Sequence, residues 1–186
     1  MINWAEHSHR ITPPSTDPVV QHDALAAHIH ALQSIPALAR SQIVLGVECN
    51  LGFESHHILT AMRRRNVAHI PLFEGPQDGP GILTTNASKE IMCVATQELL
   101  DQQRLLVSRR FVCTTASPLE AIETLSKELR TYTIVVEPPR NPFGKPRRTY
   151  TGKVGGHNDD LCIALQLAVL SMRIFNRSEK YTRFAR

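Results

Sequence analysis

Apolar residues along the chain recur at helical spacing in five stretches. Side chains three or four positions apart share one face of a helix, so each stretch is expected to pack that face inward. The predicted helices begin at Asp23, Ser55, about Ser88, residue 118 and the pair Asp159–Asp160. In the third of them, which runs to about residue 101, the inward face is predicted to carry Ile91, Ala95 and Leu99.

Extended segments separate these helices. Apolar runs rich in β-branched residues indicate buried strands. Strands are expected over residues 1–12, 42–48, 67–73 and 132–137, with a hairpin or two edge strands over 104–113. Loops are expected over residues 13–20, 74–81 and 138–157, where Pro and Gly interrupt the pattern. This order of strands and helices predicts an α/β fold, with one domain over residues 1–186.

The composition is that of a globular protein. Of the 186 residues, 42% are hydrophobic and 20% are charged, which excludes a disordered, highly charged chain. The formal net charge is +4, a mildly basic balance that is compatible with nucleic acid. No apolar run approaches the roughly 20 residues that a membrane span requires, and no signal peptide is visible, so an intracellular protein with no membrane partner is expected. The four cysteines are widely spaced and predicted to be reduced core residues.

Two acidic positions stand out against this background. Glu48 ends the apolar segment 42–48, and a carboxylate there is expected at the carboxyl edge of a sheet, where open α/β folds build their sites. Asp159 and Asp160 begin the last apolar helix. The free N–H groups of that helix end would stabilise them, and hard divalent cations prefer such oxygen ligands. Two interpretations stay open: a helix cap, or a site for Mg²⁺ or Mn²⁺ held by Glu48 with one or both aspartates.

The stretch from Pro138 to His157 is predicted to be a long basic loop. Aromatic residues are interleaved with its cations, which suits contact with a phosphate backbone. The candidate DNA-binding residues in or beside it are Arg140, Lys145, Arg147, Arg148, Lys153 and His157. A solvated loop whose charges face water is the alternative.

Three motifs carry a resemblance to a known family. They are Val-Glu-Cys-Asn at 47–50, the segment from Gly81 to Lys89, and Gly-Lys-Val-Gly-Gly-His-Asn-Asp-Asp-Leu at 152–161. Together they resemble the nuclease domain of viral DNA-packaging terminase large subunits, in particular the herpesvirus branch. Trp4-Ala-Glu-His7 is similar to the Leu-Glu-His of that family's second strand. Cys49 stands where the family usually has Gly.

The resemblance implies a fold and an activity. The fold would be RNase H-like, a mixed β-sheet with helices on both faces. The activity would be that of a two-metal-ion endodeoxyribonuclease that cuts concatemeric viral double-stranded DNA during genome packaging. Glu48, Asp159 and Asp160 would hold two Mg²⁺ or Mn²⁺ ions, and Lys89 matches the family's lysine near the scissile strand. The implied partners are the terminase ATPase domain, the small subunits and the capsid portal, in the nucleus of a host cell.

One element of that family is missing from the sequence. RNase H-like nucleases take their first metal ligand from an Asp on strand 1, which would lie before Met1 here. Asp17, in Thr-Asp-Pro, is expected to be a turn residue rather than a substitute ligand. No Walker A motif is present, so the ATPase motor is not expected in this chain. This chain alone is therefore expected to lack an essential ligand. Two alternatives follow: a catalytically incomplete module for DNA binding or assembly, or another RNase H-like nuclease such as a junction resolvase.

Overall fold

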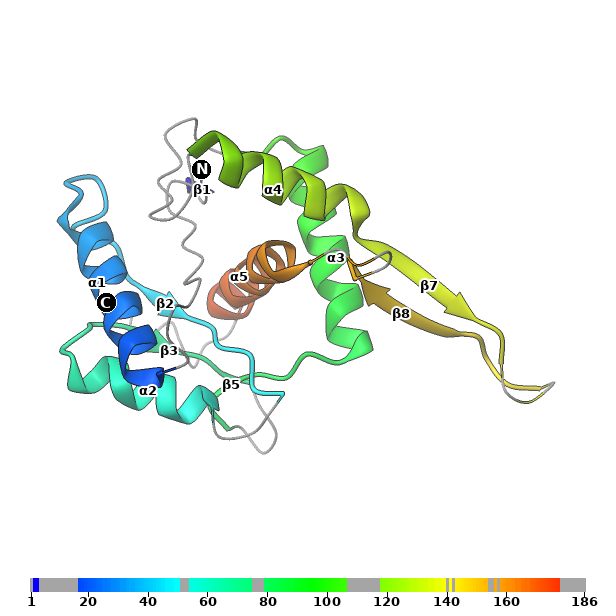
Figure 1. Cartoon of the computed structure of the whole chain (residues 1–186), viewed down its shortest axis with the longest axis horizontal. Helices are drawn as coiled ribbons and strands as arrows, with labels where there is room; N and C mark the ends of the chain where they lie inside the picture. Colours follow the sequence, from blue (N-terminus) through cyan, green and yellow to red (C-terminus); the bar gives the residue numbers. More distant parts are fainter. Residues whose placement is uncertain are drawn as a thin grey trace. The chain divides into compact units, whose positions relative to one another are not determined.

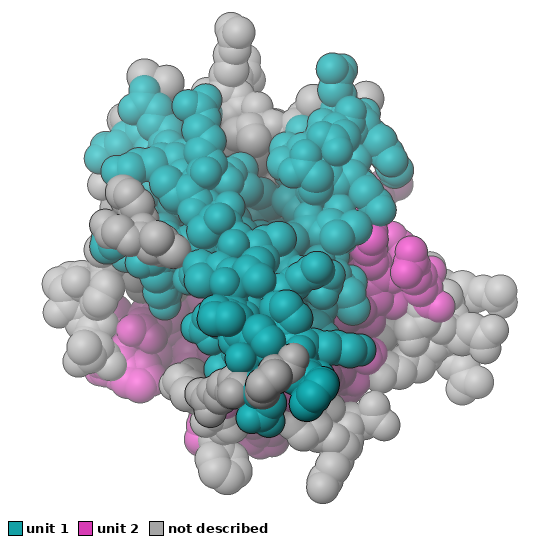
Figure 2. Space-filling view, turned by 90° about the vertical axis from the view of Figure 1, so that its right-hand side faces the viewer, with its two compact units in different colours: residues 1–8, 85–166 teal, residues 9–84, 167–186 magenta. Residues whose placement is uncertain are grey.

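A computed structural model describes residues 2–3, 17–50, 54–74, 79–106, 118–139, 141, 143–153, 156 and 158–177. Helices and short strands alternate along the described chain (Figure 1), which confirms an α/β fold in general terms. The chain divides into two compact units. One comprises residues 1–8 and 85–166, and the other comprises residues 9–84 and 167–186. Figure 2 colours them teal and magenta.

Short parallel strands form the sheet-like part of the 9–84/167–186 unit. Strand β2 (Val44–Leu45) pairs with β3 (Ile70–Pro71), and β4 (Phe73–Glu74) pairs with β5 (Gly81–Ile82). An isolated parallel bridge joins Glu48 to Ile82 and extends the pairing beyond β2. The predicted strand 42–48 is thus present as β2 followed by this bridge.

Two hydrophobic clusters hold that unit together. Helices α1 (Pro18–Ser34) and α2 (Glu54–Arg64) pack against each other through a buried cluster whose members are Ala26, Ile29, Ala61, Met62 and Val67. A second cluster places Ile70, Leu72 and Ile82 of the strands against the C-terminal part of α5 (Asp160–Arg177). The strands are therefore covered by an apolar helix, as an α/β arrangement requires.

The 1–8/85–166 unit is built from two helices, a parallel strand pair and a hairpin. Helix α3 (Asn86–Asp101) and helix α4 (Pro118–Thr131) are its main helices. The parallel pair is β1 (Ile2–Asn3) with β6 (Leu105–Leu106). An antiparallel hairpin joins β7 (Thr133–Glu137) to β8 (Arg147–Thr151), and β8 packs against α3.

The starts of two helices differ from the sequence prediction. Helix α1 begins at Pro18, and Asp17 is its N-cap, accepting a hydrogen bond from the Val19 N–H at 2.8 Å. The predicted cap at Asp23 and loop through residue 20 were wrong, because Pro at the first helical position favours an earlier start. Ser55 lies inside α2, where its buried hydroxyl donates to the Pro80 carbonyl at 2.8 Å.

Helix α3 confirms its predicted existence and corrects its inward face. Thr85 caps it through a capping box, in which the Ser88 N–H donates to the Thr85 hydroxyl and the Thr85 N–H donates to the Ser88 hydroxyl. Ile91 is 54% exposed and Met92 is fully buried in its place, while Ala95 and Leu99 are buried as predicted. Residues three and four positions before Ala95 both lie near its face of the helix, and the structure buries Met92 instead of Ile91.

The predicted loop over residues 138–157 is the largest correction. Residues Arg147–Thr151 form strand β8, whose register places Tyr150 opposite Ile134 and Arg147 opposite Glu137. The hairpin projects well beyond α3 (Figure 1). Thr149, Tyr150 and Thr151 all favour strands, so cross-strand pairing overrides the high polarity of the segment. Within the described part of the chain, no helix is long and apolar enough to cross a bilayer.

Candidate functional site

Glu48 lies in an isolated parallel bridge beyond β2, and its backbone is fixed by pairing on either side. The Ile82 N–H donates to the Val47 carbonyl at 2.7 Å, and the Cys49 N–H donates to the Ile82 carbonyl at 3.0 Å. These two bonds flank Glu48 and hold it beside β5. Strand β2 itself ends at Leu45, so Glu48 follows the strand and is not its last residue.

Asn50 and Thr84 orient the Glu48 side chain. The Asn50 Nδ2 group donates to Glu48 Oε1 at 2.6 Å, and the Thr84 hydroxyl donates to the same oxygen. Asn50 is fixed in turn, because its Oδ1 accepts from the Thr84 N–H at 2.9 Å. Among the described residues, none donates to the second oxygen, Oε2. A carboxylate with one oxygen anchored and one open is the arrangement that oriented metal ligands share.

Asp159 and Asp160 have different surroundings although they are adjacent. Asp159 is buried, its Oδ2 accepts from the Gly152 N–H at 2.9 Å, and its Oδ1 lies 3.9 Å from the Lys153 ammonium. A Cβ on Gly152 would lie 2.6 Å from the Asp159 Cβ, so Gly152 allows this close approach. Asp160 is exposed in the first turn of α5.

The predicted ligands are divided between the two units. Glu48 belongs to the 9–84/167–186 unit, and Asp159 and Asp160 belong to the 1–8/85–166 unit. Within the described ranges, no three His, Cys, Asp or Glu side chains gather as a possible metal centre. Shared coordination by these three carboxylates therefore stays a prediction.

Glu128 is a buried carboxylate that sequence reasoning missed. It lies in the last turns of α4 with 4% of its surface exposed. Its Oε2 accepts from the Leu161 N–H at 2.7 Å and from the Cys162 N–H at 2.9 Å. These bonds satisfy two of the free N–H groups that every helix start leaves unpaired. Glu128 thus caps α5, whose Leu161 lies 33 residues later in the chain. No local sequence motif predicts such a contact.

The basic residues are concentrated on the β7–β8 hairpin. Lys145 and Arg147 are exposed and form no ion pair with a described residue, whereas Arg148 lies 3.8 Å from Glu90 of α3. Phe143 is fully exposed at the turn, where the Gly144 N–H donates to the Asn141 carbonyl at 2.9 Å. The hairpin therefore presents cations and one aromatic ring to solvent.

The remaining predicted DNA-binding residues lie in three other settings. Lys89 is half-buried in the first turn of α3, where its N–H donates to the Thr85 carbonyl. Lys153 is exposed beside Asp159. Arg140 and His157 lie outside the described residues.

The described cysteines are free thiols, as predicted: Cys49, Cys93 and Cys162. Cys113 lies outside the described residues. Burial raises the pKa of Cys162 to about 12, and the neighbouring Cys93 thiol and two carboxylates add to the shift. Burial likewise raises the pKa of Cys93 and of Cys49. All three thiols therefore stay protonated at neutral pH and are poor nucleophiles.

The chain was compared with protein-family models, curated proteins and solved structures, and none of the three comparisons gave a match.

Proposed function

We propose that this chain is a metal-dependent endonuclease domain of a terminase large subunit that cuts concatemeric double-stranded DNA. The observation that carries the proposal is the Glu48 carboxylate, which lies in a parallel bridge beyond β2, with one oxygen anchored by Asn50 and Thr84 and the other without a donor among the described residues. Such anchoring typically orients a metal ligand and limits its motion. The terminase part of the proposal is supported by the residues that match the family motifs. The DNA-binding part is supported by the basic β7–β8 hairpin.

The donor chemistry of these residues fits Mg²⁺ or Mn²⁺. Glu48, Asp159 and Asp160 all offer carboxylate oxygens, and Asp159 would have to exchange its contact with the Lys153 ammonium for the ion. Bound divalent ions would supply an activated water and stabilise the leaving oxygen of the phosphate. The protein's own part is to hold the carboxylates and, through the hairpin cations, to bind the DNA backbone.

The hairpin would bind DNA through phosphates and without reading sequence. Lys145 and Arg147 are exposed and form no ion pair with a described carboxylate, although Glu137 lies opposite Arg147 in the hairpin, so they are available to displace counterions from DNA. Phosphate contacts of this kind position the duplex, and base contacts would be needed for sequence specificity. Cleavage is therefore expected to be largely independent of sequence.

A second candidate function is a DNA-binding or assembly module without catalysis. The contacts of Asp159 favour it, because the Gly152 N–H and the Lys153 ammonium already satisfy this buried carboxylate as a structural clamp would. In this case Glu48 would serve only to hold together the two segments that carry Asn50 and Thr84.

Plasmid cleavage in Mn²⁺ or Mg²⁺ separates the two functions. The assay compares the chain with its Glu48→Gln and Asp160→Asn variants. Glu123→Gln, which changes an exposed carboxylate on α4, is the matched control. Metal-dependent nicking that Glu48→Gln abolishes and Glu123→Gln spares supports the nuclease. Salt-sensitive DNA binding with no cleavage supports the binding module.

The DNA-binding role of the hairpin has its own test. The double variant Lys145→Ala/Arg147→Ala is expected to lower the slope of log K against log salt by about 1.8, because each lost phosphate contact removes about 0.9. Arg63→Ala/Arg64→Ala on α2 removes the same charge from an exposed surface elsewhere and is the control. Fluorescence anisotropy on a duplex measures both slopes. Equal slopes for the two double variants would show that the hairpin does not contact the DNA.

A further inference from the structure

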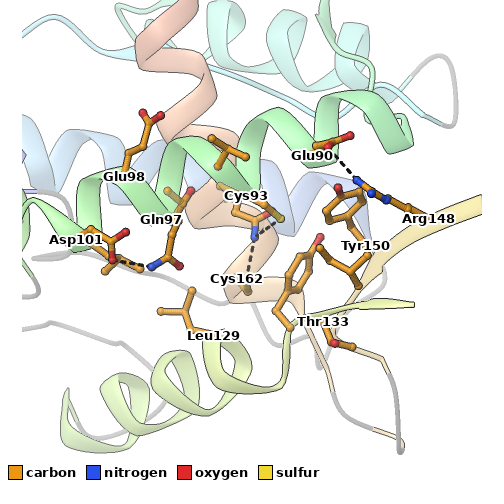
Figure 3. A pocket seen from close by; sticks show the side chains of 16 residues that line it. Glu90, Cys93, Gln97, Glu98, Asp101, Leu129, Thr133, Arg148, Tyr150 and Cys162 are labelled. Carbon is orange, nitrogen blue, oxygen red and sulfur yellow. Dashed lines mark hydrogen bonds and ion pairs between the residues drawn. The ribbon is translucent and has the colours of Figure 1, made fainter. Parts of the chain in front are cut away.

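A cavity of about 510 Å³ lies within the 1–8/85–166 unit, at the foot of the β7–β8 hairpin (Figure 3). Its walls come from α3, the C-terminal end of α4, the first turns of α5 and the base of the hairpin. Ligand sites typically measure about 300–1,000 Å³, so this space is large enough for one nucleoside. It is separate from Glu48, Asp159 and Asp160, none of which lines it.

Three buried polar atoms in the cavity lining have no partner among the described residues: Gln166 Oε1, the Thr96 hydroxyl and the Tyr132 hydroxyl. The Gln166 Nε2 group donates to the Cys162 thiol at 3.3 Å and to the Cys93 thiol at 3.6 Å, so only Oε1 of this amide is left as an acceptor. Gln166 and Thr96 are each only 3% exposed. Buried polar atoms are normally paired, so an acceptor and a hydroxyl at this depth call for a ligand that carries an N–H donor.

The sides of the cavity favour a flat aromatic ligand. The half-buried Tyr132 lines it, with the buried Tyr150 behind, and aromatic side chains are surfaces on which nucleobases stack. Three lining residues are apolar and exposed: Val94 at 52%, Leu100 at 37% and Ile134 at 51%. Covering exposed apolar side chains with a ring removes their surface from water, which is favourable.

The charges of the cavity oppose an anion inside it. At one end Arg148 is paired with Glu90, and at the other end Glu98 and Asp101 project from α3 (Figure 3). Apart from the Arg148–Glu90 pair, the described lining residues carry carboxylates and no further cation, so the lining does not attract a phosphate. The thiols of the half-buried Cys93 and the buried Cys162 stay neutral, because desolvation raises the pKa of Cys93 and raises the pKa of Cys162 to about 12. The ligand is therefore neutral, and its phosphate groups must lie outside, where the hairpin cations are.

We propose that this cavity binds an unpaired nucleobase of a DNA strand whose backbone lies along the β7–β8 hairpin. The base supplies the N–H donor for Gln166 and Thr96 and packs against the ring of Tyr132 and the exposed apolar side chains of the lining. The DNA part of this inference rests on the proposed function. It extends that function by making the preferred substrate a duplex with a locally unpaired base, since an accessible base does not have to be extracted from a stack.

The test uses two probes and one pair of matched variants. Val94→Trp fills the mouth of the cavity, and Val19→Trp places the same side chain on an exposed position of α1. Adenosine is titrated while the Gln166 side-chain amide is followed by NMR, with toluene as a ring that lacks an N–H. In parallel, anisotropy compares a fully paired duplex with the same duplex carrying one unpaired adenosine.

The expected result is a saturable shift of the Gln166 amide with adenosine that Val94→Trp abolishes and Val19→Trp retains. The duplex with the unpaired base is expected to bind about tenfold more tightly than the paired duplex, the usual effect of one stacked base. That ratio should fall to about one in Val94→Trp.

Two results would overturn the inference: no amide shift with adenosine, or an equal shift with toluene. A failure of the proposed function gives a different result. In that case neither duplex binds at low salt, and the adenosine titration still shows whether the cavity binds a nucleobase.

Discussion

The capping of α5 by Glu128 leads to a quantitative prediction for Glu128→Ala. The alanine variant leaves the N–H groups of Leu161 and Cys162 without their acceptor, and the loss of two charge-assisted hydrogen bonds costs about 3 kcal/mol. Loss of a negative charge at a helix N-terminus adds about 0.5 kcal/mol. Removing the Oε1 atom, which has no partner among the described residues, recovers about 1 kcal/mol of desolvation. The net decrease in the free energy of unfolding is about 2.5 kcal/mol.

Urea denaturation followed by circular dichroism measures this change, and hydrogen exchange of the Leu161 and Cys162 amides locates it. Glu128→Gln keeps a neutral acceptor and should lose about 1 kcal/mol. Glu123→Ala, on the exposed side of the same helix, should change stability by no more than about 0.5 kcal/mol. The reasoning is refuted if Glu128→Ala is no more destabilising than Glu123→Ala, or if the two amides exchange at the rate of the unsubstituted protein.

Two further predictions concern a pair of glycines and a thiol. At Gly81, φ is +99° and a Cβ would lie 2.7 Å from the Val47 carbonyl oxygen. Gly81→Ala should therefore lower the free energy of unfolding by about 2 kcal/mol or more. Gly156 has a φ of +79° with open space around it, so Gly156→Ala should cost only about 1 kcal/mol, and urea denaturation of both variants checks the difference. Cys162, whose pKa is raised to about 12, should resist iodoacetamide at neutral pH in the folded protein and react in urea. Mass spectrometry after labelling would contradict this if folded Cys162 were alkylated.

Elements with strong local signals were predictable from the sequence. Helix α4 and strand β7 lie within one residue of the predicted ranges 118–130 and 132–137. Their apolar spacing and short connection leave few alternatives. The Thr85 capping box starts α3 at Asn86, slightly before the predicted start near Ser88.

The errors arose where two local signals compete. Asp17-Pro18 is both a turn dipeptide and the N-cap and first residue of a helix, and the helix prevails because its inner face packs against α2. The segment Arg147–Thr151 is too polar to be recognised as a strand without knowledge of its pairing with β7.

The candidate site was predictable only in part. The position of Glu48 just after strand β2 follows from the apolar run before it, and Asp159 and Asp160 do lie at the start of α5. The clamp between Asp159 and Gly152 and the capping by Glu128 depend on tertiary contacts that have no sequence signature. Which carboxylates coordinate an ion together is set by the same kind of long-range contact.

The β7–β8 hairpin also has a consequence for how the protein behaves in concentrated solution. Within the described residues it pairs with no third strand, so its outer edges expose backbone groups beside the apolar side chains of Ile134 and Val136. Such edges are templates for edge-to-edge association, and like charges on neighbouring hairpins oppose it. Lys145 and Arg147 supply this repulsion, which salt screens over about 10 Å at roughly 0.1 M. The ionic strength that would release DNA from the hairpin therefore also weakens the barrier to self-association.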